Sequence, residues 1–114
     1  GVHDFKAFQA SGGTVKTTIR EILEAEIMTE APHFPGGLPA EFQLLRIRLV
    51  GTGFLKQMVR SIAGTLLQVG QGRHPPSVMR QILGTQDRKA VGPTAPPQGL
   101  WLERVWYGEN LIVD

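Results

Sequence analysis

The sequence predicts an α+β domain in which an antiparallel sheet packs against helices, and three observations favour this class. Two segments before residue 52 alternate apolar and polar residues, which is the pattern of strands with one buried face. From Leu55 onward the apolar residues recur at helical spacing instead. A last apolar stretch, residues 100–107, predicts a closing strand. We therefore expect one domain over residues 1–114, with the element order β-β-α-α-β.

Two strands are expected in the first half of the chain. The first spans residues 17–30, TTIREILEAEIMTE. Its expected buried face comprises Ile19, Leu23, Ala25 and Ile27, interrupted by Glu21. Residues 31–40 are rich in proline and glycine and predict a loop. The second strand is expected over residues 41–51, where apolar residues alternate with Arg46 and Arg48.

Two helices are expected after these strands. The first runs from Leu55 to Val69, and the glycines and prolines of residues 70–76 end it. The second spans residues 75–84, with Gly84 as its end. Residues 87–99 are expected to form an irregular loop. The closing strand is expected to place Leu100 and Leu102 in the core, with Val105 as a further candidate.

Composition and charge limit the functional classes. The net charge is +2, a mild excess that permits a nucleic-acid partner without requiring one. The chain has no cysteine, which excludes disulfides, thiolate nucleophiles and cysteine-ligated metals. No apolar run reaches the length of a membrane span. We expect a cytoplasmic protein without membrane association.

The glycines of residues 51–53, G-T-G, follow a predicted strand as they do in a dinucleotide-binding loop. That fingerprint, G-x-G-x-x-G, requires a third glycine where this sequence has Lys56. A G-x-x-x-x-G-K-[ST] phosphate loop is also absent. His3, His33 and His74 lie far apart in sequence, without a second ligand at a metal-binding spacing. The residues therefore predict neither a nucleotide site nor a metal site.

Arg60 falls at the edge of the apolar arc of the first predicted helix. One interpretation is a solvated cation at the helix edge. The other is a guanidinium held against the apolar flank, where it can pair with a buried carboxylate or a phosphate. Arg46 and Arg48 likewise fit a solvated sheet face or a phosphate-binding patch. Four aromatic residues fit the core or an interface better than stacking on a base: Phe54, Trp101, Trp106 and Tyr107.

Residues 51–107 carry a series of motifs that resembles the C-terminal half of the TruA-type tRNA pseudouridine synthases. The series is G-x-G-F-L, then M-V-R-x-I-x-G-x-L, a glycine that ends the helix, D-R, and a G-P-T-A-P-x-x-G-L loop before a closing strand. The N-terminal HDFKAF, residues 3–8, is similar to the family's H-D-F-x-A-F. The resemblance covers essentially the whole chain, and the combination of motifs is specific.

The resemblance implies the C-terminal half of the pseudouridine synthase fold. It implies an enzyme that isomerises uridine to pseudouridine in the anticodon stem-loop of tRNA, acting on an extruded base without cofactor or metal. It also implies a homodimer for the full-length protein.

The catalytic aspartate of this family lies in an R-T-D-x-G-V-H motif of the N-terminal half, which this sequence lacks. The GVHD of residues 1–4 shares three letters with that motif, but Asp4 follows the histidine and is expected to be structural. We therefore expect the chain to be inactive alone. The alternative is a non-catalytic RNA-binding or dimerisation module.

The resemblance also implies roles for individual residues. Arg60 is expected to face the catalytic aspartate, lower its pKa and fix its orientation. Leu100 is expected against the uracil ring, and Phe54 in the core at the base of the helix. Four basic residues are candidates for tRNA phosphate contacts or for a plain solvated role: Lys56, Arg73, His74 and Arg88.

Overall fold

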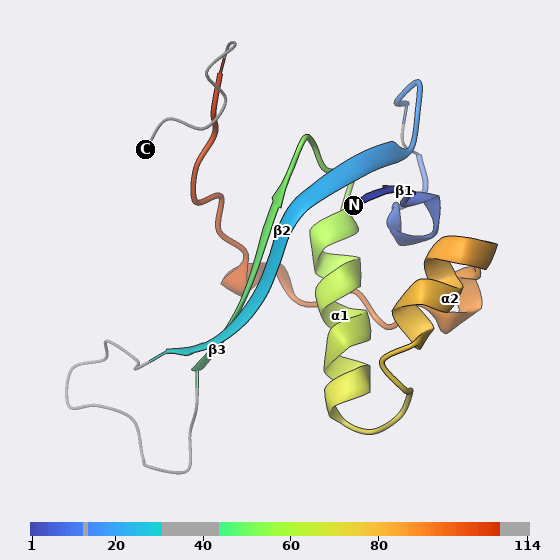
Figure 1. The fold of residues 1–114 in the computed structure, drawn as a ribbon, viewed down its shortest axis with the longest axis vertical. Coiled ribbons are helices and arrows are strands. Elements are labelled where there is room, and N and C mark those ends of the chain that lie inside the picture. The colour runs from blue at the N-terminus through green and yellow to red at the C-terminus, as the bar shows by residue number, and fades with distance from the viewer. Residues whose placement is uncertain (13, 31–43, 108–114) are drawn as a thin grey trace.

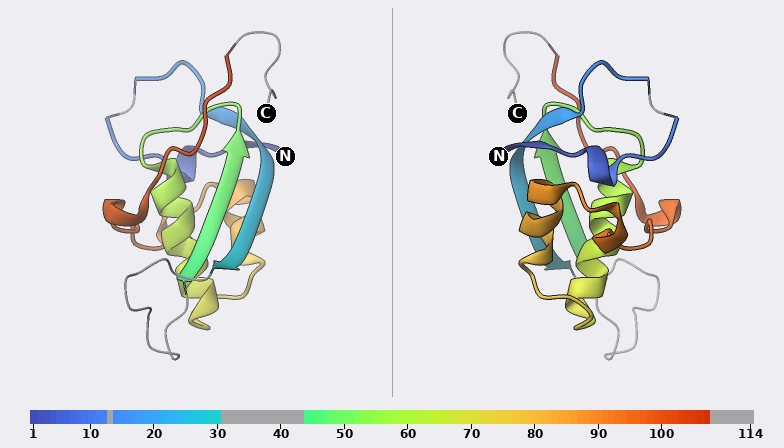
Figure 2. Two further views of the ribbon diagram at one scale, coloured as in Figure 1. Left: turned by 90° about the vertical axis from the view of Figure 1, so that its left-hand side faces the viewer. Right: turned by 90° about the vertical axis from the view of Figure 1, so that its right-hand side faces the viewer.

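A three-stranded antiparallel sheet carries two helices on one of its faces (Figures 1 and 2). The computed structural model describes residues 1–12, 14–30 and 44–107. The strands are β1 (Val2–Asp4), β2 (Ile19–Glu30) and β3 (Leu44–Gly51), in the spatial order β1-β2-β3. The helices are α1 (Met58–Gly70) and α2 (Val78–Thr85), and single 3₁₀ turns occupy Lys6–Phe8, Arg88–Ala90 and Pro97–Gly99. The predicted α+β class is confirmed.

The pairing of β2 with β3 contains an irregularity at Leu23. The register shifts between Ile22 and Glu24, so that Leu23 is an extra residue on its strand. Such a bulge changes the alternation of side chains between the two faces. Ile22 and Leu49 consequently pack against the core, whereas Leu23 is half exposed. Both predicted strands are confirmed, but the predicted buried face is wrong, because its four members are all exposed: Ile19, Leu23, Ala25 and Ile27.

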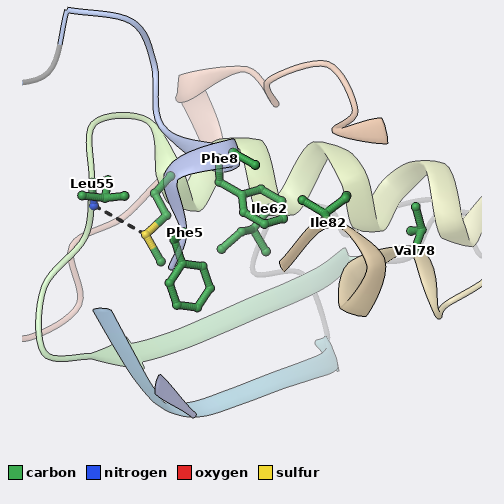
Figure 3. Close-up of a cluster of buried hydrophobic side chains, with 8 residues drawn as sticks. Phe5, Phe8, Leu55, Ile62, Val78 and Ile82 are labelled. Carbon is green, nitrogen blue, oxygen red and sulfur yellow. Dashed lines mark hydrogen bonds between the residues drawn. The ribbon is translucent and has the colours of Figure 1, made fainter. Parts of the chain in front are cut away.

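The hydrophobic core lies between the helices, the sheet and the N-terminal segment (Figure 3). Phe8, Met58 and Ile82, which come from the first 3₁₀ turn, α1 and α2, have exposed fractions of 1%, 0% and 0%. Burial of side chains of this size contributes about 1.5–3 kcal/mol each. The other members of the buried cluster are Phe5, Ala7, Leu55, Ile62 and Val78. The core therefore joins the N-terminal segment to both helices.

Gln86 attaches the N-terminal segment to the end of α2. Its Oε1 accepts a hydrogen bond from the Ala7 N–H (3.0 Å), and its Nε2 donates to the carbonyl oxygens of Asp4 (2.8 Å) and Leu83 (3.1 Å). The Asp4 carboxylate accepts a hydrogen bond of 2.6 Å from the Thr18 hydroxyl, which agrees with its expected structural role. This segment also forms β1, which the sequence analysis did not predict and which pairs with β2.

Both helices begin three residues later and end one residue later than the sequence predicts, since α2 begins at Val78 rather than at residue 75. α1 begins at Met58 rather than at Leu55, because Gln57 before it adopts a left-handed conformation with a φ of 60°. α2 passes through Gly84 and ends at Thr85, followed by the left-handed Gln86. The loop expected over residues 31–40 lies outside the described residues. Within the described chain, no helix is long and apolar enough to cross a membrane.

The prediction of a closing strand over residues 100–107 is wrong. These residues run past the side of the sheet that faces away from the helices (Figure 1), and in the described part of the chain they pair with no strand. Leu100, Leu102 and Val105 are 50%, 81% and 46% exposed, so none of them belongs to the core. An alternating pattern becomes a strand only beside a partner, and the pattern itself does not show whether a partner is present.

Candidate active site

Arg60 lies in the first turn of α1, where residues 92–96 cross the helix. Its Nε donates a hydrogen bond of 2.8 Å to the carbonyl oxygen of Ala95, and the Ala95 N–H donates one of 3.0 Å to the Arg60 carbonyl oxygen. The residue is half-buried. Among the described residues, no hydrogen bond or ion pair engages the two terminal nitrogens of this guanidinium. The side chain is therefore held by its Nε, while the terminal N–H groups can bind a carboxylate or a phosphate.

Residues 92–96 approach α1 so closely that only a glycine fits beneath them. A Cβ atom on Gly64 would lie 1.6 Å from the carbonyl oxygen of Pro93. On the next residue of α1, the buried hydroxyl of Thr65 accepts a hydrogen bond of 2.9 Å from the Gly92 N–H. The same hydroxyl donates one of 2.8 Å to the Ser61 carbonyl oxygen. The loop that holds Arg60 is thus itself fixed to the helix that carries Arg60.

Leu100 follows this loop, directly after the 3₁₀ turn Pro97–Gly99. Its N–H donates a hydrogen bond of 3.0 Å to the Pro97 carbonyl oxygen, and its side chain is half exposed. A short stretch of chain therefore connects Leu100 to Ala95, which binds Arg60. An exposed leucine beside an ordered turn can offer an apolar contact to a ring. Its role against uracil stays a prediction.

The basic residues predicted to contact tRNA do not form one cluster. Lys56 is exposed just before α1 and Arg73 is exposed beyond its other end, so a helix of 13 residues, about 20 Å long, separates them. Arg88 is exposed beside the N-terminal segment, where its Nη2 donates to the Lys6 carbonyl oxygen at 3.3 Å. His74 is half-buried. If these residues bind RNA, they contact separate phosphates along an extended surface. Their roles in RNA binding stay predictions.

Arg46 and Arg48 lie on the face of β3 opposite the helices, and both are paired with carboxylates. Arg48 Nη1 lies 3.0 Å from Glu24 Oε2, and Arg48 Nε lies 2.9 Å from Glu103 Oε2. Arg46 Nη1 lies 3.9 Å from Glu103 Oε1. The hydrogen bond from Arg48, followed by its positive charge, lowers the pKa of Glu103 below its ordinary value. Carboxylates thus compensate the charges of both arginines. Arg46 and Arg48 therefore fit a solvated sheet face better than a phosphate-binding patch.

The glycines of residues 51–53 are not placed to bind a phosphate. α1 begins at Met58, so its N-terminal N–H groups do not follow Gly53 directly. Glycine is needed at position 51 for a different reason, because the backbone of β2 lies close to it. A Cβ atom on residue 51 would lie 2.8 Å from the Glu21 carbonyl oxygen. In the described ranges, no group of three or more His, Cys, Asp or Glu side chains is arranged to hold a metal ion.

Of the four aromatic residues selected in the sequence, three lie at the surface. Phe54 is 41% exposed, and Trp101 and Tyr107 are 83% and 84% exposed, so the core interpretation is wrong for all three. Trp106 is half-buried, and the Arg104 guanidinium lies 5.9 Å from the centre of its ring. For the exposed rings, an interface stays the favoured prediction and stacking on a base the alternative.

Comparison with known proteins decides the family. The family model described as tRNA pseudouridine synthase matches residues 1–108. The chain belongs to this family. It is 42% identical to tRNA pseudouridine synthase A of Syntrophomonas wolfei, 45% to that of Myxococcus xanthus and 37% to that of Geobacillus kaustophilus. These similarities cover 96%, 96% and 99% of this chain.

The same similarities cover only 40%, 38% and 40% of the three relatives. The chain thus spans about 40% of the length of the curated relatives that it matches. The predicted resemblance to the TruA-type tRNA pseudouridine synthases is confirmed, and with it a family of isomerases that modify tRNA.

The surroundings of Arg60 include residues to which the sequence alone assigned no individual role. Gly64 offered a signal, because it lies four positions after Arg60 on the same side of the helix, and a glycine inside a helix usually has a packing reason. Thr65 offered a weaker signal, since its hydroxyl lies within an apolar stretch. Ala95 lies in the G-P-T-A-P motif, but this motif does not indicate the contact with Arg60, because Ala95 acts through its backbone carbonyl oxygen.

Proposed function

We propose that residues 1–114 form the C-terminal domain of an enzyme that isomerises uridine to pseudouridine in the anticodon stem-loop of tRNA. Family membership supports the reaction class. The observation that carries the proposal is the state of Arg60, which is half-buried and held at Nε by the Ala95 carbonyl oxygen. The hydrogen bond at Nε orients the guanidinium and with it the two terminal nitrogens. A guanidinium fixed in this way is suited to bind one carboxylate in a bidentate manner.

The partner of Arg60 in this proposal is a catalytic aspartate that lies outside the 114 residues. At a separation of 4 Å and an intermediate dielectric constant, two unit charges attract each other by about 4 kcal/mol. Such an attraction favours the ionised aspartate, lowers its pKa and orients it toward the base. Without that aspartate, the chain is expected to be inactive.

The tRNA is the macromolecular partner in this proposal. Leu100 packs against the uracil ring of the extruded nucleotide, and Lys56, Arg73 and Arg88 neutralise phosphates along the exposed surface. His74 belongs to the same candidates. No cofactor or metal takes part, the complete enzyme is a homodimer, and it acts in the cytoplasm.

A second candidate function is a non-catalytic RNA-binding or dimerisation module. The exposed aromatic residues of the C-terminal segment favour it, because exposed apolar surface of this kind marks interaction sites. The coding sequence upstream of Gly1 separates the two candidates. An R-T-D-x-G-V-H motif there supports the synthase, whereas a stop codon or an unrelated domain supports the module.

Substitution of Arg60 in the complete synthase tests the proposal directly. We expect Arg60→Ala to lower pseudouridine formation in an anticodon stem-loop substrate by about 100-fold or more, the usual effect of removing one preorganised electrostatic contact. Arg60→Lys should recover only part of the activity, because an ammonium group cannot reproduce the bidentate geometry. Arg80→Ala is the control, since it removes an exposed arginine of α2. Near-normal turnover of Arg60→Ala would refute the proposed role.

A further inference from the structure

We propose that Gly64 and Thr65 are positioning residues that dock residues 92–96 onto α1, so that the Ala95 carbonyl oxygen orients the Arg60 guanidinium. This inference rests on the proposed function, because it assigns to the loop a role in the same reaction. It adds two residues that act through Arg60. Thr65 acts by its hydroxyl group, and Gly64 acts by having no side chain.

The first contact is between Gly64 and the loop backbone. A Cβ atom on Gly64 would lie 1.6 Å from the Pro93 carbonyl oxygen, 2.8 Å from its carbonyl carbon and 3.3 Å from the Ala95 nitrogen. Backbone atoms cannot rotate away as a flexible side chain can. Gly64 lies within α1, so its requirement for glycine comes from space and not from a left-handed φ. Any larger residue must push the loop off the helix.

The second contact is the hydroxyl of Thr65, whose side chain is fully buried. It accepts the Gly92 N–H at 2.9 Å and donates to the Ser61 carbonyl oxygen at 2.8 Å. Gly92 in turn allows close approach, because a Cβ atom on it would lie 2.9 Å from the Gly64 carbonyl oxygen. Together these contacts fix the start of the loop against the middle of α1.

The end of the loop reaches Arg60. Ala95 forms two hydrogen bonds with it, one to the Arg60 backbone and one to Nε. Nε lies at the base of the planar guanidinium, so this bond fixes the plane in which the terminal nitrogens meet a carboxylate. A loop displaced by about 1 Å would redirect that plane, and misplacement on this scale lowers catalytic rates strongly.

The test uses four variants of the complete synthase. Gly64→Ala fills the space beneath Pro93. Gly70→Ala is its matched control, since a Cβ atom on Gly70, the last residue of α1, meets nothing within 4 Å. Thr65→Val removes the hydroxyl at nearly constant volume, and Thr65→Ser restores it. We expect Gly64→Ala and Thr65→Val to lower kcat about tenfold or more, with KM for tRNA within about twofold of wild type. Gly70→Ala and Thr65→Ser should stay near wild type.

Two further measurements separate positioning from a general loss of structure. Amide hydrogen exchange at Gly92 and Ala95 should accelerate in Gly64→Ala and Thr65→Val but not in their controls. In an Arg60→Lys background, Thr65→Val should add little to the loss of kcat, because residues that act through one group are not additive. Unchanged exchange, unchanged kcat or full additivity would refute this proposal. A wild-type enzyme that forms no pseudouridine would instead refute the proposed function, and this inference with it.

Discussion

Gln57 and Gln86 both adopt the left-handed backbone conformation, with φ values of 60° and 55°. For residues other than glycine and asparagine, this conformation is less favourable than the right-handed one by about 1–2 kcal/mol. The two residues differ in what their side chains contribute. Gln57 is exposed and makes no capping hydrogen bond at the start of α1, whereas the side chain of Gln86 makes three hydrogen bonds.

Glycine at these two positions should therefore have opposite effects. Gln57→Gly relieves the backbone strain and should raise the free energy of unfolding by about 0.5–1 kcal/mol, after the entropic penalty of glycine in the unfolded chain. Gln86→Gly relieves the same strain but leaves the Ala7 N–H and two carbonyl oxygens without their partner. It should lower the free energy of unfolding by about 1–3 kcal/mol. Urea denaturation measures both, and changes of the same sign would contradict this account.

At the scale of elements, the sequence predicted the two long strands and both helices, because their periodicity is local. It did not predict β1, whose 3 residues are too few to show a period and which forms only through pairing with β2. It could not reveal the bulge at Leu23, because a register shift depends on both strands. The hydrogen bond from Arg60 Nε to the Ala95 carbonyl oxygen could not be predicted for a similar reason, since a contact to the backbone 35 positions away does not depend on the residue type.

The ion pairs between β3 and the C-terminal segment are a second feature at this scale. Arg48 lowers the pKa of Glu103 in the folded state. The stabilisation from Glu103 is therefore complete above the ordinary pKa of a glutamate, and it is lost as the pH falls through the folded-state pKa.

This coupling predicts the titration of Glu103. In the wild-type protein, the Glu103 carboxyl carbon should titrate with a midpoint below the ordinary value of 4.5, and Arg48→Ala should raise that midpoint. Arg46→Ala should have a smaller effect, because its closest approach to Glu103 is 3.9 Å. Carbon-detected NMR across the acid range measures each midpoint. A midpoint in Arg48→Ala equal to that of wild type would show that the ion pair does not form.

At the scale of the whole molecule, apolar side chains concentrate outside the core at the C-terminal segment. Trp101, Leu102 and Tyr107 are each more than 80% exposed, with values of 83%, 81% and 84%. The chain spans about 40% of the length of its relatives. Exposed surface of this kind favours association, so self-association of the 114-residue chain would not by itself demonstrate the proposed dimer.

Replacement of exposed residues should separate association from stability. Trp101→Ser combined with Leu102→Ser should change the free energy of unfolding by less than about 0.5 kcal/mol, because neither side chain contributes to the core. The same variant should self-associate less in sedimentation experiments at high protein concentration. Phe8→Ala is the contrast, with an expected loss of about 3–5 kcal/mol. A large loss of stability in the double variant, or unchanged association, would contradict this description of the segment.

The hydrogen bonds of the Gln86 side chain also have a consequence for the chemical ageing of the protein. Deamidation would convert this residue to glutamate, whose ionised side chain can accept hydrogen bonds but not donate them. A carboxylate oxygen would then face the carbonyl oxygens of Asp4 and Leu83, where the Nε2 group now donates to both. A single slow hydrolysis, without any break in the chain, would thus turn the attachment of the N-terminal segment into a repulsion.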